Sequence, residues 1–150
     1  MRIVIQRVLS ARVDTANGTA GAIGPGLLVL VGVAEGDTDE DALYLARKTA
    51  GLRIFDDAEG VMNRSLADTG GEALVVSQFI LMGSTRKGNR PSWQRAAGHE
   101  LAVPLYERYC TLLSQAIGRR AERGVFGADM RVSLVNDGPV TLVIDSRLRE

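Results

Sequence analysis

The residue types that most often act as nucleophiles, bases or metal ligands are scarce in this chain. Ser77 follows an apolar run and could attack a carbonyl carbon, but a serine nucleophile needs a base within hydrogen-bond reach. His99 is the only histidine, so it is either that base or a solvated residue near a helix start. No Gly-x-Ser-x-Gly elbow surrounds Ser77. One cysteine and one histidine also give no ligand spacing, so we expect neither a metal nor another cofactor.

A group of basic residues lies in the glycine-bearing segment 83–90. Gly83 and Gly88 are five residues apart, but Asn-Arg follows where a phosphate-binding loop requires Lys-Ser or Lys-Thr. Lys87 and Arg90 therefore either lie in a solvated loop or contact phosphates of an RNA end. The residues alone leave both alternatives open.

Apolar patterns along the chain predict six strands and two helices around these residues. The predicted strands cover residues 1–13, 27–33, 52–55, 73–81, 130–135 and 140–144, and the predicted helices cover 37–49 and 102–118. Asn136, Asp137, Gly138 and Pro139 separate the last two strands, and their turn chemistry predicts a tight hairpin. Hairpin-connected strands with two helices are typical of an α+β domain.

Two segments together resemble the signature of the D-aminoacyl-tRNA deacylase family. Residues 77–81 read Ser-Gln-Phe-Ile-Leu and are similar to the family's Ser-Gln-Phe-Thr-Leu. Residues 136–141 read Asn-Asp-Gly-Pro-Val-Thr and are similar to its Asn-x-Gly-Pro-Val-Thr. Further similar segments extend the resemblance over nearly the whole chain; they are residues 6–8, 24–33, 52–57, 62–63, 87–92 and 126–130.

The resemblance implies a fold and an activity. The implied fold is a strongly curved, barrel-like, mostly antiparallel sheet with two main helices packed outside, in a homodimer. The implied activity is hydrolysis of the ester between a D-amino acid and the 3′ end of tRNA, and of glycyl-tRNA as well. From its length we expect residues 1–150 to form one domain, able to bury about 68–70% of its unfolded surface.

For the catalytic site, the resemblance implies a wall formed by Ser77, Gln78, Phe79 and Ile80. Main-chain N–H groups at a strand end can stabilise the oxyanion of ester hydrolysis, and in the family the terminal ribose hydroxyl of the RNA helps to activate water. Ile80 departs from the family pattern, which carries threonine there. We interpret this departure as favouring main-chain catalysis; the alternative is an inactive or re-targeted member.

For selectivity, the resemblance implies a chiral gate. Gly138 and Pro139, joined by a cis peptide bond, insert from one subunit into the pocket of the other, where their carbonyls exclude an L side chain. Asn136 and Met130 are expected at the same gate. Arg7 is expected near the dimer interface, where it helps to hold the Gly-Pro segment of the partner subunit.

The composition limits which partners and which cellular compartment we expect. The 18 basic and 18 acidic residues give no net charge, so a tRNA must be held over a small area, such as its single-stranded 3′ end. No apolar run approaches about 18 residues, so no membrane span is expected. The single Cys110 and the early charge at Arg7 favour the cytoplasm. Two other functions stay open: a non-catalytic RNA-end binding module, and a small-molecule esterase using Ser77.

Overall fold

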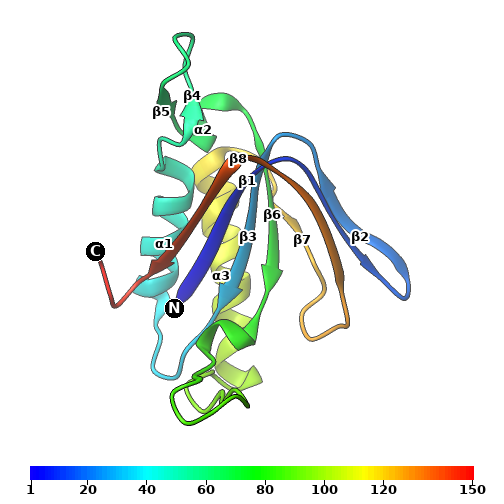
Figure 1. Cartoon of the computed structure of the whole chain (residues 1–150), viewed down its shortest axis with the longest axis vertical. Coiled ribbons are helices and arrows are strands. Elements are labelled where there is room, and N and C mark those ends of the chain that lie inside the picture. Colours follow the sequence, from blue (N-terminus) through cyan, green and yellow to red (C-terminus); the bar gives the residue numbers. More distant parts are fainter.

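A strongly curved sheet forms the centre of the molecule in the computed structural model, which describes residues 1–150 (Figure 1). Its six strands are β1 (Arg2–Thr15), β2 (Gly18–Ile23), β3 (Gly26–Gly32), β6 (Glu72–Ser77), β7 (Glu122–Arg123) and β8 (Arg131–Asp145). β1 pairs antiparallel with β2, β3 and β8, whereas β6 lies parallel to β3 and β7. The predicted α+β class and the barrel-like, mostly antiparallel sheet are therefore confirmed.

The position of β3 between β1 and β6 explains its unbroken apolar sequence. Val29 and Val31 belong to the main core between the sheet and the helices, whereas Leu28 belongs to a second core cluster with Val8 and Leu74. A strand that is covered on both faces has apolar residues at successive positions. The predicted buried central strand at residues 27–33 is confirmed to within one residue at each end.

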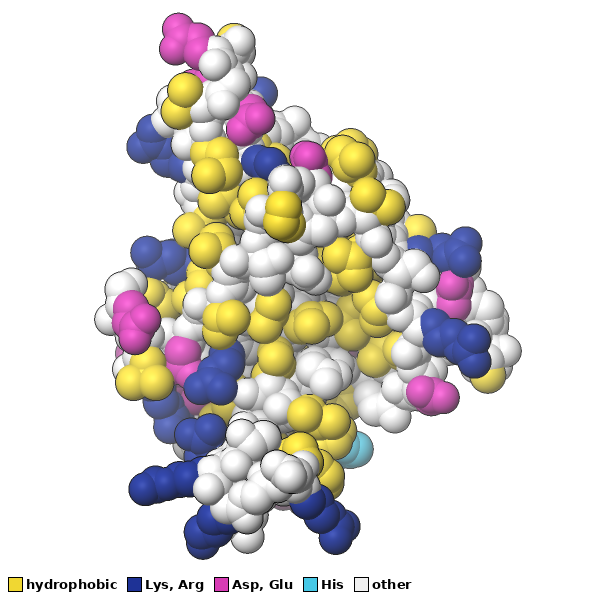
Figure 2. Space-filling model, in the orientation of Figure 1, with side chains coloured by type: hydrophobic (Ala, Val, Ile, Leu, Met, Phe, Trp, Pro, Cys, Tyr) yellow, Lys and Arg dark blue, Asp and Glu magenta, His cyan; other side chains and the backbone are white.

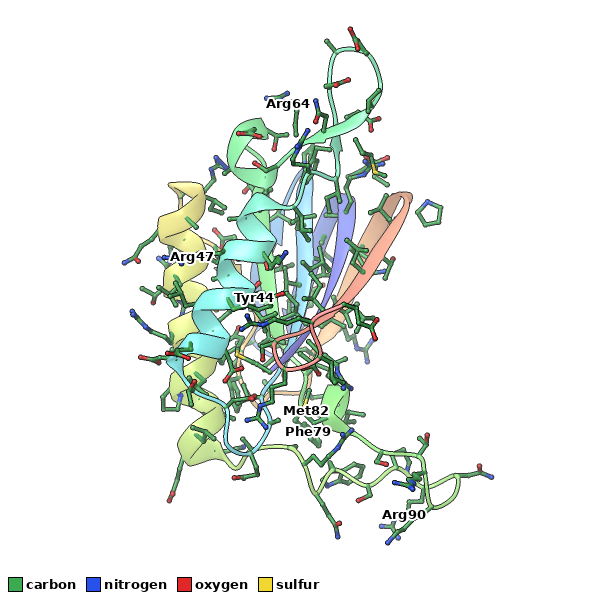
Figure 3. All side chains as sticks on the ribbon, turned by 90° about the vertical axis from the view of Figure 1, so that its left-hand side faces the viewer. Tyr44, Arg47, Arg64, Phe79, Met82 and Arg90 are labelled. Carbon is green, nitrogen blue, oxygen red and sulfur yellow. The ribbon has the colours of Figure 1, made fainter.

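Two helices, α1 (Asp39–Gly51) and α3 (His99–Ile117), lie side by side against one face of the sheet (Figures 1 and 3). α1 follows Thr38, whose N–H donates to the Asp41 carboxylate over 2.8 Å. Its acidic first turn suits the positive end of the helix dipole. Between the helices, the hydroxyl groups of Thr49 and Tyr109 are 2.7 Å apart and form a buried hydrogen bond. None of the helices is long and apolar enough to cross a membrane.

Two predicted element boundaries are wrong around the helices. The strand predicted at 52–55 does not form, because the N–H of Leu52 donates to the Lys48 carbonyl and ends α1 there. The chain then forms a separate projecting hairpin of β4 (Phe55–Asp56) and β5 (Met62–Arg64), followed by the short helix α2 (Leu66–Thr69). α3 begins at His99, three residues before the predicted start, with Gly98 as its N-cap.

The strand predicted at 73–81 is correct only as far as Ser77. β6 ends there, and the chain turns into a short 3₁₀ helix, η1 (Phe79–Met82). The N–H of Leu81 donates to the Gln78 carbonyl over 3.2 Å, and the N–H of Gly83 donates to the Ile80 carbonyl over 2.7 Å. The apolar run continues past the strand end, which is why the pattern did not mark this change.

The hairpin predicted at residues 136–139 is wrong. Both halves of β8 pair with β1 and not with each other: Asn136 stands opposite Val8, and Thr141 stands opposite Gln6. Residues 137–140 are therefore a bulge that faces a single residue of β1, Arg7. Gly138 has a φ of +145°, a conformation that favours glycine, and Pro139 has no N–H to offer to the ladder.

Candidate active site

A pocket of about 410 Å³ lies where β3 and β6 end and α3 begins. Its lining is mostly hydrophobic and comes from five parts of the fold: β3, β6 with η1, the loop before α3, the first two turns of α3, and the segment 126–130. Of the predicted site residues, it brings together Ser77, Gln78, Phe79 and Met130. Largely apolar pockets with a few polar groups are typical of small-ligand sites.

Main-chain hydrogen bonds decide which donors remain at the strand end. The N–H of Gln78 donates to the Val31 carbonyl over 2.8 Å, and the N–H of Leu81 is engaged inside η1. The N–H groups of Phe79 and Ile80 stand at the start of η1 and have no acceptor within it. The donors available in this segment are thus fewer than predicted for residues 77–81. The side chain of Ile80 is 45% exposed and does not line the pocket.

Ser77 and His99 both line the pocket, but no hydrogen bond joins their side chains. The ring of His99 instead packs edge-on against Phe126, with 5.5 Å between the ring centroids. The ring of Phe126 also contacts that of Tyr106, at 5.6 Å. A serine nucleophile with a histidine base therefore has no preformed contact in this structure.

The bulge of β8 is held by the side chain of Asn136. Its Oδ1 accepts the N–H of Val140 over 2.8 Å, and its Nδ2 donates to the Val140 carbonyl over 3.2 Å and to the Thr141 hydroxyl over 3.1 Å. The amide thus engages both main-chain groups of Val140, which lies where the bulge rejoins the strand. Within the bulge, the peptide bond between Gly138 and Pro139 is cis.

Arg7 lies under the bulge and is only 8% exposed. Its Nε donates to the Asp137 carbonyl over 2.9 Å, and one terminal nitrogen donates to the Ile54 carbonyl over 2.6 Å. The carboxylates of Asp56 and Asp137 lie 3.7 Å and 3.5 Å from the guanidinium. Arg7 was expected to hold the Gly-Pro segment of a partner, whereas these contacts are to the bulge and to the segment 54–56 of its own chain.

The bulge and the pocket lie apart within one chain. The pocket includes Val31, which pairs with Ile3 of β1, whereas the bulge stands opposite Arg7. Ile3 and Arg7 are four positions apart along β1, which corresponds to about 13 Å of strand. Neither Gly138 nor Pro139 lines the pocket. The predicted wall and the Gly138–Pro139 part of the predicted gate therefore do not meet in a single copy, whereas Met130, the other expected gate residue, lies with the wall.

Lys87 and Arg90 lie in the loop between η1 and α3. They line a second hollow, of about 330 Å³, which has no hydrophobic lining residue. Figure 2 shows dark-blue side chains around the lower end of the molecule, where Figure 1 places this loop. Figure 3 shows Arg90 near its tip and Phe79 on the adjoining η1. The basic loop thus adjoins the pocket rather than lying on a distant face.

Sequence reasoning missed several pocket residues. Phe126, Tyr106 and the loop residue Ala96 line the pocket, but apolar side chains carry no chemical signal of their own. Cys110 is fully buried on α3, and burial raises the pKa of its thiol to about 11. No group of three or more His, Cys, Asp and Glu side chains is arranged to hold a metal ion.

Comparison with known proteins identifies the family. The model of the D-Tyr-tRNA(Tyr) deacylase family matches residues 4–145. D-aminoacyl-tRNA deacylases of Opitutus terrae and Porphyromonas gingivalis are 60% and 56% identical over 150 residues, which cover all of both chains in each case.

Two solved structures share the fold. The c-Myc DNA Unwinding Element Binding Protein has a TM-score of 0.90 and 36% identity, over 97% of this chain and 98% of the other. A protein described as a probable eukaryotic D-amino acid tRNA deacylase shares the fold, with a TM-score of 0.82 and 20% identity over 96% of this chain and 98% of the other. From its sequence and its fold, the chain belongs to the D-Tyr-tRNA(Tyr) deacylase family.

Proposed function

We propose that this protein hydrolyses the ester bond of D-aminoacyl-tRNA and releases free D-amino acid and tRNA. The observation that carries this proposal is the identity of 56–60%, over the full chain, with relatives named D-aminoacyl-tRNA deacylase. Membership of this family makes the chain a hydrolase that acts on ester bonds. The apolar pocket at the end of β6 offers room for the aminoacylated 3′ end of the RNA.

We assign the catalytic wall to Ser77, Gln78 and Phe79, which line this pocket, and to the main chain of Ile80, whose side chain lies outside it. A water oxygen attacks the ester carbonyl carbon as the water gives up a proton, and the carbonyl oxygen becomes an oxyanion. The carbonyl then re-forms, the bond to the ribose oxygen breaks, and that oxygen takes up the proton. We assign the N–H groups of Phe79 and Ile80 to the oxyanion, because no acceptor within η1 engages them. The terminal ribose hydroxyl of the RNA helps to activate the water. The reaction so described uses neither a metal nor another cofactor.

The Gly138–Pro139 bulge is the chiral gate, and it acts on the pocket of a second copy in a homodimer. Its separation from the pocket of its own chain supports an action in trans. The carbonyls of Gly138 and Pro139 fill the space that an L side chain needs, whereas a D side chain points elsewhere. Glycine has no side chain to exclude, so glycyl-tRNA is cleaved too. Asn136 and Arg7 hold the bulge in place, and Met130 lines the pocket that receives it.

We further propose that residues 1–150 form one domain and that the enzyme acts in the cytoplasm. A single cysteine that is buried and unpaired supports a reducing compartment. Lys87 and Arg90 lie beside the pocket and contact the incoming RNA.

The test is release of amino acid from D-tyrosyl-tRNA and L-tyrosyl-tRNA, measured side by side with purified protein. Rapid release from the D-ester, with the L-ester intact, is the expected result. Release from both esters would contradict the proposed chiral gate. Release from neither would contradict the proposed enzymatic activity.

Two other functions are separated by the same assay. A binding module without turnover has one specific support, the structural relative that is named for binding DNA; such a module would bind aminoacyl-tRNA and release nothing. A small-molecule esterase that uses Ser77 would lose its activity in His99→Ala. The proposed main-chain mechanism needs no general base at His99, so that variant should still cleave the D-ester.

A further inference from the structure

We propose that the loop between η1 and α3 binds the phosphates of the unpaired nucleotides that precede the terminal residue of the RNA. Trp93 is the stacking surface between these phosphates and the pocket. We call the loop cations and Trp93 together the binding track. It rests on the proposed deacylase function and adds to it a binding surface for the RNA strand. Binding to this surface is independent of sequence, because every nucleotide offers a phosphate and an aromatic base.

This loop carries an excess of positive charge. Between Glu72 and Glu100 the chain has no acidic residue but four basic ones: Arg86, Lys87, Arg90 and Arg95. The whole chain has no net charge, so this excess is local. Phosphate contacts supply most of the non-specific affinity of nucleic-acid-binding proteins, and in this chain a short segment provides them.

These four cations are also free of partners within the protein. None of them forms an ion pair, whereas six other arginines each pair with a carboxylate: Arg2, Arg7, Arg12, Arg108, Arg123 and Arg147. None of the four side chains donates a hydrogen bond to another residue, since Arg86 bonds only through its main-chain N–H. Their charge is therefore available to a ligand.

The loop encloses a hollow of its own. Two main-chain hydrogen bonds between Ser84 and Ser92, of 2.6 Å and 2.9 Å, close its base. The four cations line this basic hollow together with Ser84, Ser92 and Gln94. Guanidinium, ammonium, hydroxyl and amide groups are the side-chain donors that proteins use to contact phosphate oxygens.

The basic hollow and the pocket share a wall. Ser92 and Gln94 line the hollow, whereas Trp93, between them in sequence, lines the pocket. The Trp93 ring is 46% exposed and meets Phe79 edge-to-face, with 5.8 Å between centroids. An exposed aromatic ring beside a cationic groove is the arrangement that single-stranded nucleic acids bind. A strand with its last residue in the pocket thus has Trp93 and then the hollow next to it.

The test uses Trp93 as its own reporter, because it is the only tryptophan of the chain. Its fluorescence is titrated with the RNA trinucleotide CpCpA, which carries no amino acid, and separately with adenosine. We expect CpCpA to bind at least tenfold more tightly than adenosine at low salt. Its two phosphates should give a slope of log affinity against log salt of about −1.4, at about −0.7 for each contact with a single strand. Adenosine should show no such slope.

A matched pair of double variants locates the binding. Arg86→Gln with Arg90→Gln should bring the CpCpA affinity and salt slope close to those of adenosine and leave adenosine binding unchanged. Arg47→Gln with Lys48→Gln removes the same charge from the outer face of α1, away from Arg90 (Figure 3), and should change neither. All four side chains are exposed, so the variants should fold.

Four outcomes would contradict the binding track: equal affinity for CpCpA and adenosine, normal CpCpA binding by the loop variant, an equal loss in the α1 control, or displacement of CpCpA by polyglutamate at equal charge. Failure of the proposed function has a different signature. If the protein binds CpCpA with the expected salt slope but releases no D-amino acid, the binding track stands and the proposed activity is contradicted. If the protein cleaves the D-ester but the loop variant binds CpCpA normally, the proposed activity stands and the binding track is contradicted.

Discussion

Arg7 of β1 and Asp137 of β8 are joined by a hydrogen bond of 2.9 Å, from the guanidinium Nε to the main-chain carbonyl. The same guanidinium donates to the Ile54 carbonyl, in the segment that leads into β4. Because residues 137–140 leave the ladder opposite Arg7, no main-chain bond to β1 can hold them there. One buried cation therefore fixes the bulge to two parts of the fold.

Arg7→Lys should lower both the stability of the protein and its preference for the D-ester. A lysine ammonium keeps the charge but lacks the planar fork that reaches two carbonyls at once. Loss of one hydrogen bond from a charged group costs about 1.5–3 kcal/mol of unfolding free energy. Urea denaturation and release from D- and L-tyrosyl-tRNA measure the two effects. Arg12→Lys, an exposed position on the same strand, is the control and should change neither. A less stable variant with full selectivity would limit Arg7 to a structural role.

Asn136→Asp and Asn136→Ala should distinguish the two hydrogen bonds between the Asn136 amide and the main chain of Val140. Aspartate keeps the acceptor for the Val140 N–H but loses the donor to its carbonyl, whereas alanine loses both. We expect stability and D-over-L selectivity to fall in the order Asn, Asp, Ala, with about 1–3 kcal/mol lost where a buried group is left unpaired. Thermal unfolding and the paired ester assay provide the readouts. An alanine variant with intact selectivity would show that the bulge keeps its shape without the amide.

The Cys110 thiol should make the protein less stable at alkaline pH. Its pKa is raised by burial from 9.0 to about 11. Above pH 9 the unfolded chain loses the thiol proton while the folded chain keeps it, so the stabilising effect present below pH 9 is lost as the pH rises towards 11. Urea denaturation at pH 8 and pH 10 measures the decrease, which should be smaller in Cys110→Ala. An equal decrease in both proteins would assign it to the buried phenols of Tyr106 and Tyr109, whose pKa values burial also raises.

The sequence predicted those elements whose signals are local. The burial of β3 on both faces makes residues 27–33 apolar throughout, and the acidic first turn of α1 marks its start. The bulge at 137–140 could not be distinguished from a hairpin in this way. The turn-forming residues 136–139 suit a turn whether the flanking strands pair with each other or with a third strand. The deciding contact comes from Arg7, which is 130 residues away in sequence.

The same limit applies to the candidate site, where local motifs revealed some residues and long-range packing determines the others. The resemblance of residues 77–79 and Met130 to the family motifs led to side chains that line the pocket. Phe126 and Tyr106 complete the pocket through packing between α3 and the segment before β8, which no spacing along the chain reveals. The change from strand to η1 after Ser77 was also hidden, because Phe79 and Ile80 prolong the apolar run although both are largely exposed.

Ile80→Thr restores the residue that the family pattern carries, and it should change the rate of D-ester hydrolysis little. The side chain of Ile80 lies outside the pocket, and the assigned donor is its N–H, which threonine keeps. Single-turnover release from D-tyrosyl-tRNA measures the chemical step directly. Ile80→Val, which has the shape of threonine without the hydroxyl, is the matched control. A hundredfold gain with threonine but not with valine corresponds to about 2.7 kcal/mol of barrier. That result would show that a threonine hydroxyl, and not the main chain alone, carries catalysis at this position.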